Sequence, residues 1–431
     1  MMSRPRANAA LPPQPLFDTY ETFIESTVAE YAADHPEIAR YIQSFEPGIA
    51  AGEDYKHVRA FLNSYNSVKT TFNGYRTHVE RLLLWSWIFA GKSVLTLRRS
   101  DIESFMAFSA APHPTWVANK ISKRFVVSGG TLAANPEWRP FTVKVSKSSR
   151  KLGSEEGSMT SSLPYSMSQG SVRQVFAVCS SFYDFLIHEG LSMEANPCRA
   201  IKQKGKFIKR NMKVDSSKSL TRLQWDYVVD VAENMANEDP DKYERSLFIL
   251  VTLQSMYLRV SDLVGNVHWT PTMGSFVKKG EFWWYQVIGK GNVEAEITVK
   301  PDYLQYLTRY RRSRGLSDLP SAREQSPLIT SRWGRGGLTD RQVRNLIQEV
   351  FDKAVKQMQD EGRTEDELVN LREASLHWLR HTGATFDAPF RDPKHLQADL
   401  RHKALATTQN VYYNAIDDER AAGVANLKVR D

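Results

Sequence analysis

The segment LHWLRHTGAT gathers ionisable side chains whose types and spacing could act on a phosphate. His377, Arg380 and His381 stand three and four residues apart, so they share one face if the segment is helical. That face offers a guanidinium, which pairs well with phosphate, and two imidazoles that can exchange protons near neutral pH. By themselves, such histidines are more often structural than catalytic.

Three further segments carry side chains of complementary chemistry. They are SMYLRVSDLVG with Arg259, VIGKGNVEAEITV with Lys290, and DLRHKALATTQNVYYN with His402 and Tyr412. Each residue has an ordinary explanation when taken alone: an ion pair at a helix end, a solvated turn, or a core position. Their combination and their order along the chain favour a shared site.

Together these groups are suited to breaking a phosphodiester through a tyrosine. Negative charge grows on the non-bridging oxygens as phosphorus becomes pentavalent, and forked guanidiniums stabilise that charge. A phenol with a pKa of about 10 is a poor nucleophile at pH 7 unless a neighbouring base removes its proton. An ammonium can protonate the leaving oxygen.

The order of the motifs resembles the tyrosine recombinase family of phage integrases. The family pattern is an arginine, a lysine on a β-hairpin, His-x-x-Arg, a second histidine or tryptophan, and then a tyrosine. The strings LRVSDLVG, IGKGN, LRHTGAT and LATTQNVY are similar to family strings, and the resemblance covers the chain from about Ser67 to Asn426. It implies site-specific DNA recombination through a covalent 3′-phosphotyrosyl intermediate, independent of metal and ATP.

The resemblance also implies a catalytic set. In it, Arg259 and Arg380 bind the phosphate oxygens, and His377 is the base. His402 donates a hydrogen bond to the phosphate, Lys290 protonates the leaving group, and Tyr412 is the nucleophile. No cofactor or metal belongs to this set, because arginines neutralise the developing charge.

Three residues depart from the family pattern. Tyr257 stands where a glycine usually precedes the Leu-Arg pair, and Arg401 and Lys403 replace the usual glycine and serine on either side of the second histidine. The added positive charge is compatible with DNA.

The nucleophile has a competitor in the adjacent Tyr413. Members of the family place the tyrosine nine or ten residues after the second histidine. Tyr412 follows His402 by ten residues, so the spacing favours Tyr412. Consecutive helical residues point about 100 degrees apart, so only one tyrosine can address the phosphate. A type IB topoisomerase, a telomere resolvase, a non-catalytic DNA-binding relative and a basic helical protein with an unrelated partner remain alternative functions.

Helical and alternating patterns predict a mainly α protein whose catalytic part is α+β. Residues 1–54 are predicted to be a tail with one accessory helix, and 55–201 an all-α core-binding domain that contacts DNA, with an irregular insertion at about 111–166. Residues 202–218 are rich in lysine and arginine and predict a linker. The remainder, 219–431, is predicted to be the catalytic domain with a small antiparallel sheet.

The positions of the motifs follow from the elements around them. SVKTTFNGYRTHVERLLLWSWIFAGK and SVRQVFAVCSSFYDFLIHEG repeat apolar residues at helical spacing, and ERSLFILVTLQSMYL is apolar enough to be an interior helix. EFWWYQVIGKGNVEAEITV holds two β-rich runs around GKGN, which predicts a hairpin.

Composition limits the partners. The chain has 431 residues and a net charge of +8, which favours a polyanionic partner. It has no apolar run of about 18 residues, so no membrane partner is expected. Cys179 and Cys198 suit reduced thiols in a cytoplasm. The resemblance implies double-stranded DNA in the nucleoid, bound by a homotetramer on paired sites with or without accessory recombinases.

Overall fold

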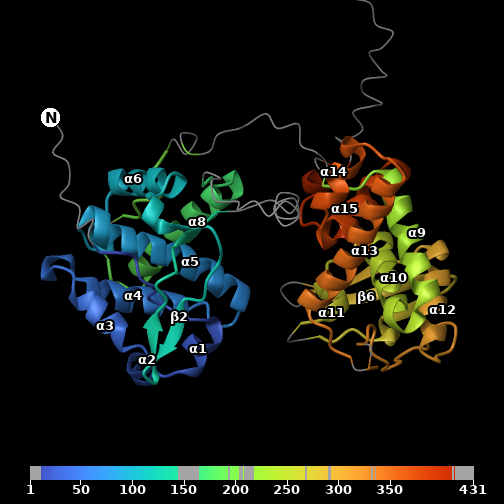
Figure 1. Cartoon of the computed structure of the whole chain (residues 1–431), viewed down its shortest axis with the longest axis horizontal. Helices are drawn as coiled ribbons and strands as arrows, with labels where there is room; N and C mark the ends of the chain where they lie inside the picture. The colour runs from blue at the N-terminus through green and yellow to red at the C-terminus, as the bar shows by residue number, and fades with distance from the viewer. Residues whose placement is uncertain are drawn as a thin grey trace, which may run out of the picture. The chain divides into compact units, whose positions relative to one another are not determined.

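A computed structural model of the chain divides into two compact units, Met1–Met212 (unit 1) and Lys213–Asp431 (unit 2) (Figure 1). The structure describes residues 11–143, 165–192, 195–202, 207, 218–266, 269–289, 293–331, 333–334, 336–409 and 412. The predictions about Lys290, Tyr413 and most of the basic linker lie outside the described residues.

Unit 1 is mainly helical and is organised around α5 (Lys69–Trp85). The helix continues as one π-helical turn, η2 (Ser86–Ala90), and ends at Gly91, whose φ of 61° suits a residue without a side chain. α5 contacts α4 (Ala51–Asn63) and α8 (Gln169–His188) through its apolar face, which confirms the predicted amphipathic helices. The other helices of the unit are α1 (Tyr20–Glu25), α2 (Val28–Asp34), α3 (Pro36–Gln43), α6 (Arg99–Ala110) and the short η1 (Pro47–Ile49), η3 (Val94–Thr96) and η4 (Pro114–Trp116).

The N-terminal segment holds more structure than the predicted tail with one helix. It forms α1, α2 and α3, and the side chains of Leu16 and Phe17 are fully buried in the core of unit 1. The buried carboxylate of Glu80 on α5 accepts hydrogen bonds from the backbone N–H groups of Leu16 at 2.8 Å and Phe17 at 3.3 Å. This long-range anchor corrects the expectation of a tail for residues 11–54.

Unit 1 also contains small sheets where an irregular insertion in an all-α domain was expected. β2 (Phe125–Ser128) and β3 (Thr131–Ala134) form an antiparallel hairpin through Gly129 and Gly130, whose φ values of 58° and 85° favour glycine. β1 (Val117–Ala118) pairs in parallel with β4 (Phe141–Thr142). Residues 144–164 of the predicted insertion lie outside the described residues. Cys179 and Cys198 are both buried in this unit.

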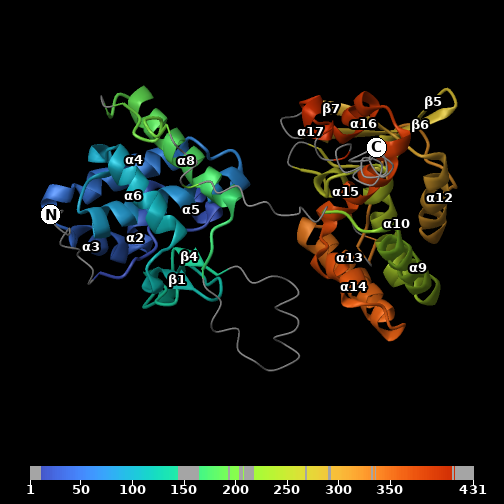
Figure 2. The ribbon, with the colours of Figure 1, turned by 90° about the horizontal axis from the view of Figure 1, so that it is seen from above.

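Unit 2 surrounds one buried helix, α10 (Pro240–Ser255), which confirms the predicted interior position of its apolar sequence. α10 contacts α9, α12, α13 and α15 (Figures 1 and 2). The helices around it are α9 (Arg222–Glu238), α11 (Ser261–Val264), α12 (Leu304–Ser313), α13 (Asp340–Asp360), α14 (Glu365–Glu373), α15 (Leu376–Asp387), α16 (Pro393–Leu400), α17 (Leu405–Thr408) and the short η6 (Met273–Ser275), η7 (Pro301–Tyr303) and η8 (Ala388–Phe390).

A three-stranded antiparallel sheet completes unit 2 and confirms the mainly α class with a small sheet. Its order is β5 (Phe276–Lys279), β6 (Phe282–Gly289) and β7 (Val293–Thr298). Gly289 pairs with Val293, so the chain reverses where the GKGN hairpin was predicted. Among the described residues, no helix has the length and apolarity needed to cross a membrane.

The crossing of α15 over α10 requires a glycine. A Cβ atom added to Gly383 would lie 2.0 Å from the backbone oxygen of Gln254, which is far inside van der Waals contact. The backbone of α10 cannot move away without disturbing the core, because protein interiors are closely packed. Gly383 therefore sets the distance between the two helices.

We expect Gly383→Ala to lower the free energy of unfolding of unit 2 by about 2 kcal/mol or more through overpacking. Differential scanning calorimetry of the full chain measures this change. Gly170→Ala is the control, because a Cβ there meets nothing nearer than 3.9 Å. Equal effects of the two substitutions would contradict the close helix crossing.

Candidate active site

The predicted site residues of unit 2 that the structure describes come from α15, from the turns after α10 and α16, and from the segment after α17. Figure 2 shows α16, α17 and β7 at one end of this unit. α15 supplies His377, Arg380 and His381, which are on one helical face as their spacing predicts. α16 leads into the turn that carries His402, and Tyr412 follows α17.

Arg380 is the most buried ionisable group of the site, with 1% of its surface exposed. Its guanidinium donates hydrogen bonds to the backbone oxygens of Tyr257 and Leu400, and Nη2 lies 3.4 Å from Nε2 of His402. Burial, and next the charge of Arg259, lower the pKa of Arg380 to about 9, so the group is still a cation at pH 7.

Two left-handed turns bring those carbonyls to Arg380. Tyr257 has a φ of 52° and Arg401 a φ of 53°, in the region that favours glycine. These are two of the positions where the sequence departs from the family pattern by replacing a glycine. A residue with a side chain in this conformation costs about 1–2 kcal/mol, which the contacts of the two side chains must offset.

Arg259 lies in the turn between α10 and α11, and its backbone N–H donates to Oδ2 of Asp262 at 2.8 Å. Among the residues that the structure describes, its guanidinium has no hydrogen-bond or ion-pair partner. Burial, followed by the charge of Arg401, lowers the pKa of this guanidinium. Arg259 is thus a partly buried cation able to bind an anion.

His402 is held by the helix that follows it. Its Nδ1 lies 2.9 Å from Oγ1 of Thr408, and its ring stacks on that of Tyr412 with 6.2 Å between centroids. Burial, and next the charge of Arg380, lower the pKa of His402 to about 4. The ring is therefore neutral at pH 7, and Nε2 can accept from Arg380 while Nδ1–H donates to Thr408.

Tyr412 is 2% exposed, and its hydroxyl lies 2.9 Å from Nδ1 of His381. The ring of His381 in turn meets that of His377 edge-on, with 4.5 Å between centroids. Burial raises the pKa of Tyr412 to about 12, although Arg380 and Arg259 act in the opposite direction. Burial and His377 lower the pKa of His381 to about 4, so the tyrosine donates and the neutral imidazole accepts.

The structure brings together five of the six residues that the sequence singles out: Arg259, His377, Arg380, His402 and Tyr412 perturb one another's pKa values. Lys290, the sixth, lies outside the described residues. The preceding Gly289 borders the site, because a Cβ there would lie 3.5 Å from Nη1 of Arg401.

The base of the hairpin is tied to the site from both strands. On β6, the hydroxyl of Tyr285 donates to the backbone oxygen of Asp262 at 2.7 Å. On β7, Thr298 donates to the carboxylate of Asp399 through its backbone N–H at 3.1 Å and its hydroxyl at 2.6 Å. Both strands are therefore held beside the segments that carry Asp262 and Asp399.

Sequence reasoning left three contacting residues out of the catalytic set. His381 shares a face with His377, so its spacing was a usable signal. Thr408 and Arg401 gave weaker signals in the sequence. Thr408 contacts His402 and Arg401 contacts Asp262, and only the tertiary structure brings these residues together.

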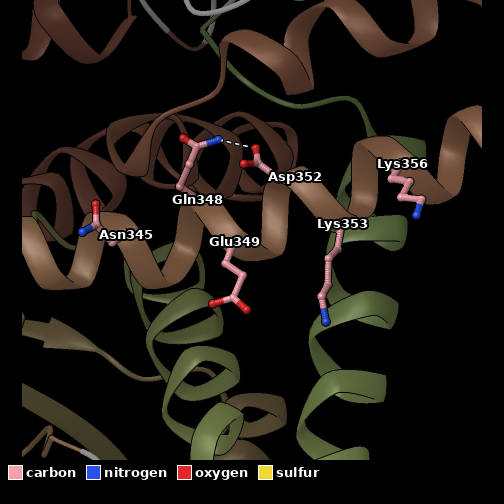
Figure 3. Close-up of a pocket in the computed structure, with 6 residues that line it drawn as sticks. All are labelled: Asn345, Gln348, Glu349, Asp352, Lys353 and Lys356. Carbon is pink, nitrogen blue, oxygen red and sulfur yellow. Dashed lines mark hydrogen bonds between the residues drawn. The ribbon is translucent and has the colours of Figure 1, made fainter. Parts of the chain in front are cut away.

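The hollow shown in Figure 3 does not belong to this site. It measures about 490 Å³ and is lined by side chains of α13, among which Gln348 donates to Asp352 at 2.7 Å. Its lining includes none of the residues of the candidate site, and we assign no chemistry to it. Among the described residues, no three His, Cys, Asp or Glu side chains are grouped so that they could hold a metal ion.

No protein-family model and no curated protein matches the chain. Among solved structures, it is similar to the XerH site-specific recombinase bound to its difH substrate, with 12% identity, 96% of this chain and 99% of that chain covered, and a TM-score of 0.48. It is also similar to the Tn1549 transposon integrase in complex with transposon right end DNA, with 15% identity, 86% of this chain and 98% of that chain covered, and a TM-score of 0.49. A third similar structure is a lambda integrase dimer bound to a COC′ core site, with 14% identity, 91% of this chain and 89% of that chain covered, and a TM-score of 0.49. Because these identities and TM-scores are low, we base the function on the side chains of the site.

We expect unit 2 to lose stability as the pH falls from about 6.5 to about 4. His381 and His402 have pKa values lowered to about 4 in the folded chain, so the unfolded chain binds more protons in this range. The stability is fully present above the ordinary histidine pKa of about 6.5. Thermal unfolding between pH 7.5 and 4.5 measures the loss, and His381→Gln/His402→Asn should flatten it. An unchanged slope in that variant would refute the assignment.

Proposed function

We propose that the protein is a tyrosine-type DNA strand transferase that acts in site-specific recombination. The observation that carries the proposal is the Tyr412 phenol, hydrogen-bonded to a neutral imidazole beside two guanidiniums, one of which has no partner among the described residues. A phosphodiester is the substrate that fits a phenol nucleophile with forked cations around it. The order of the sequence motifs supports the same conclusion.

The reaction balances without a metal or ATP. The oxygen of Tyr412 attacks phosphorus, the bond from phosphorus to the 5′-oxygen breaks, and a 3′-phosphotyrosyl linkage forms. Lys290, which follows Gly289 at the end of β6, supplies the proton for the 5′-hydroxyl. The phosphodiester energy is retained in the new ester, so a second 5′-hydroxyl can attack it and release the tyrosine.

Arg259 and Arg380 have different parts in the proposed clamp. Arg380 already donates to two backbone carbonyls, so its position is fixed before substrate arrives. Arg259 retains its hydrogen-bonding capacity and contributes the main new bonds to the phosphate. His402 approaches through Nε2 and donates to the phosphate once the anion raises its pKa.

The proton of Tyr412 has two possible acceptors. The sequence points to His377, whereas the contact of the tyrosine hydroxyl is with His381. The pKa values of about 12 for Tyr412 and about 4 for His381 keep the proton on the tyrosine at equilibrium. The proton must therefore move as the oxygen–phosphorus bond forms, and a bound phosphate assists by raising the pKa of the imidazole. We propose His381 as the immediate acceptor.

The proposed partner is double-stranded DNA, in keeping with the net charge of +8. We further propose that the protein works as a homotetramer on paired sites, with or without accessory recombinases, in the nucleoid of a cytoplasm. Tetramers would allow four strands to be exchanged in pairs. These assignments follow from the resemblance of the motifs.

Tyr412→Phe should abolish covalent attachment to nicked suicide substrates that bear candidate sites, because it removes only the nucleophilic oxygen. The measurement is a denaturant-stable protein–DNA adduct on a gel. Tyr413→Phe is the matched control and should retain the adduct. Loss of the adduct only in Tyr413→Phe would overturn the nucleophile, and absence of any adduct with wild type would favour a non-catalytic DNA-binding protein. Relaxation of supercoiled DNA without a site requirement would favour a topoisomerase.

His381→Gln should slow adduct formation by about 10²–10⁴-fold, because glutamine keeps a hydrogen-bond acceptor but cannot take the proton. His377→Gln should have a smaller effect. With wild type, the second-order rate should hold its value down to about pH 5, since the pKa of His381 in the DNA-free protein is about 4. A larger loss in His377→Gln would return the role of base to that residue.

A further inference from the structure

Arg401 makes a buried, two-pronged ion pair that the proposed chemistry does not use. Nη1 lies 3.1 Å from Oδ1 of Asp262, and Nη2 pairs with Oδ2. The side chains are 10% and 3% exposed, respectively. The pair joins the turn beside His402 to the turn that carries Arg259.

Asp262 is also the acidic neighbour of Arg259. Its Oδ2 accepts a hydrogen bond from the backbone N–H of Arg259 at 2.8 Å, and this bond holds the carboxylate in the same turn as Arg259. The Asp262 carboxylate raises the pKa of the Arg259 guanidinium, which shows that the two charges attract each other, whereas Arg401 lowers it. Without Arg401, a buried carboxylate would stand unpaired beside the guanidinium of Arg259.

We propose that Arg401 is a positioning residue that occupies the carboxylate of Asp262 and thereby leaves the guanidinium of Arg259 free for the scissile phosphate. This inference rests on the proposed function. A buried carboxylate without a partner is costly, so it binds a nearby cation. A forked guanidinium satisfies both carboxylate oxygens at once, and Arg401 takes that place first.

The backbone conformation at Arg401 supports the role proposed for its side chain. With a φ of 53°, the position favours glycine, and arginine is held there despite its conformational cost. Glycine would relieve the backbone but leave Asp262 unpaired. A simple structural clamp between two turns would explain the contact as well, but it predicts a different result when both charges are removed.

Four variants separate the explanations: Arg401→Gln, Arg401→Lys, Asp262→Asn and the double variant Arg401→Gln/Asp262→Asn. If Arg401 keeps Arg259 free, Arg401→Gln slows adduct formation at least about tenfold, because Asp262 now binds Arg259. Arg401→Lys, Asp262→Asn and the double variant stay within about threefold of wild type, since none leaves an unpaired carboxylate. Lys403→Gln removes an exposed charge nearby and is the matched control.

A second measurement does not need DNA. Inorganic phosphate should raise the Tm of wild type relative to chloride at equal ionic strength, and this rise should vanish in Arg259→Gln and Arg401→Gln but return in the double variant. This pattern without any covalent adduct would overturn the proposed function and support the role of Arg401.

Three results would overturn the role of Arg401. The first is a double variant as slow as Arg401→Gln in adduct formation and equally unresponsive to phosphate, which is the behaviour of a structural clamp. The second is an Arg401→Gln variant that equals wild type. The third is a wild-type Tm that does not respond to phosphate.

Discussion

The site depends on one buried guanidinium that is bonded to two backbone carbonyls. Arg380 lies almost completely out of water, where an uncompensated charge would be very costly. The oxygens of Tyr257 and Leu400 compensate it, and they are available because the chain turns left-handed at Tyr257 and Arg401. Arg380 thereby joins the end of α10 to the end of α16, and the remaining groups of the site are arranged around this junction.

Burial, together with the nearby positive charges, explains why the histidines of the site are neutral. Burial and the neighbouring guanidiniums hold His402 neutral, and burial with His377 does the same for His381. Neutral imidazoles can accept protons or hydrogen bonds, whereas imidazoliums cannot. The same cations favour an incoming anion, whose charge would raise the pKa values of the histidines. The protonation of the site is therefore expected to change when a phosphate binds.

At two positions where the family pattern has glycine, side-chain contacts stabilise a left-handed backbone conformation. Where glycine would adopt a left-handed turn at little cost, this chain has Tyr257, whose hydroxyl donates to Asp387, and Arg401, which pairs with Asp262. Each turn is held by a contact far along the chain. Gly383 is the opposite case, since the nearness of α10 leaves no room for a side chain.

By itself, the sequence predicted several of the main elements and proposed the residues of the site. Periodicity identified α5, α8, α10 and the hairpin of β6 and β7, and motif order selected five residues that the fold brings together, with Lys290 outside the described residues. Local patterns succeed there because they report which face of an element is buried. The tertiary structure alone decided that His381 contacts Tyr412, that Arg401 pairs with Asp262 and that Glu80 anchors Leu16. Such contacts join residues distant in the chain, and their formation depends on how helices cross, which no local pattern records.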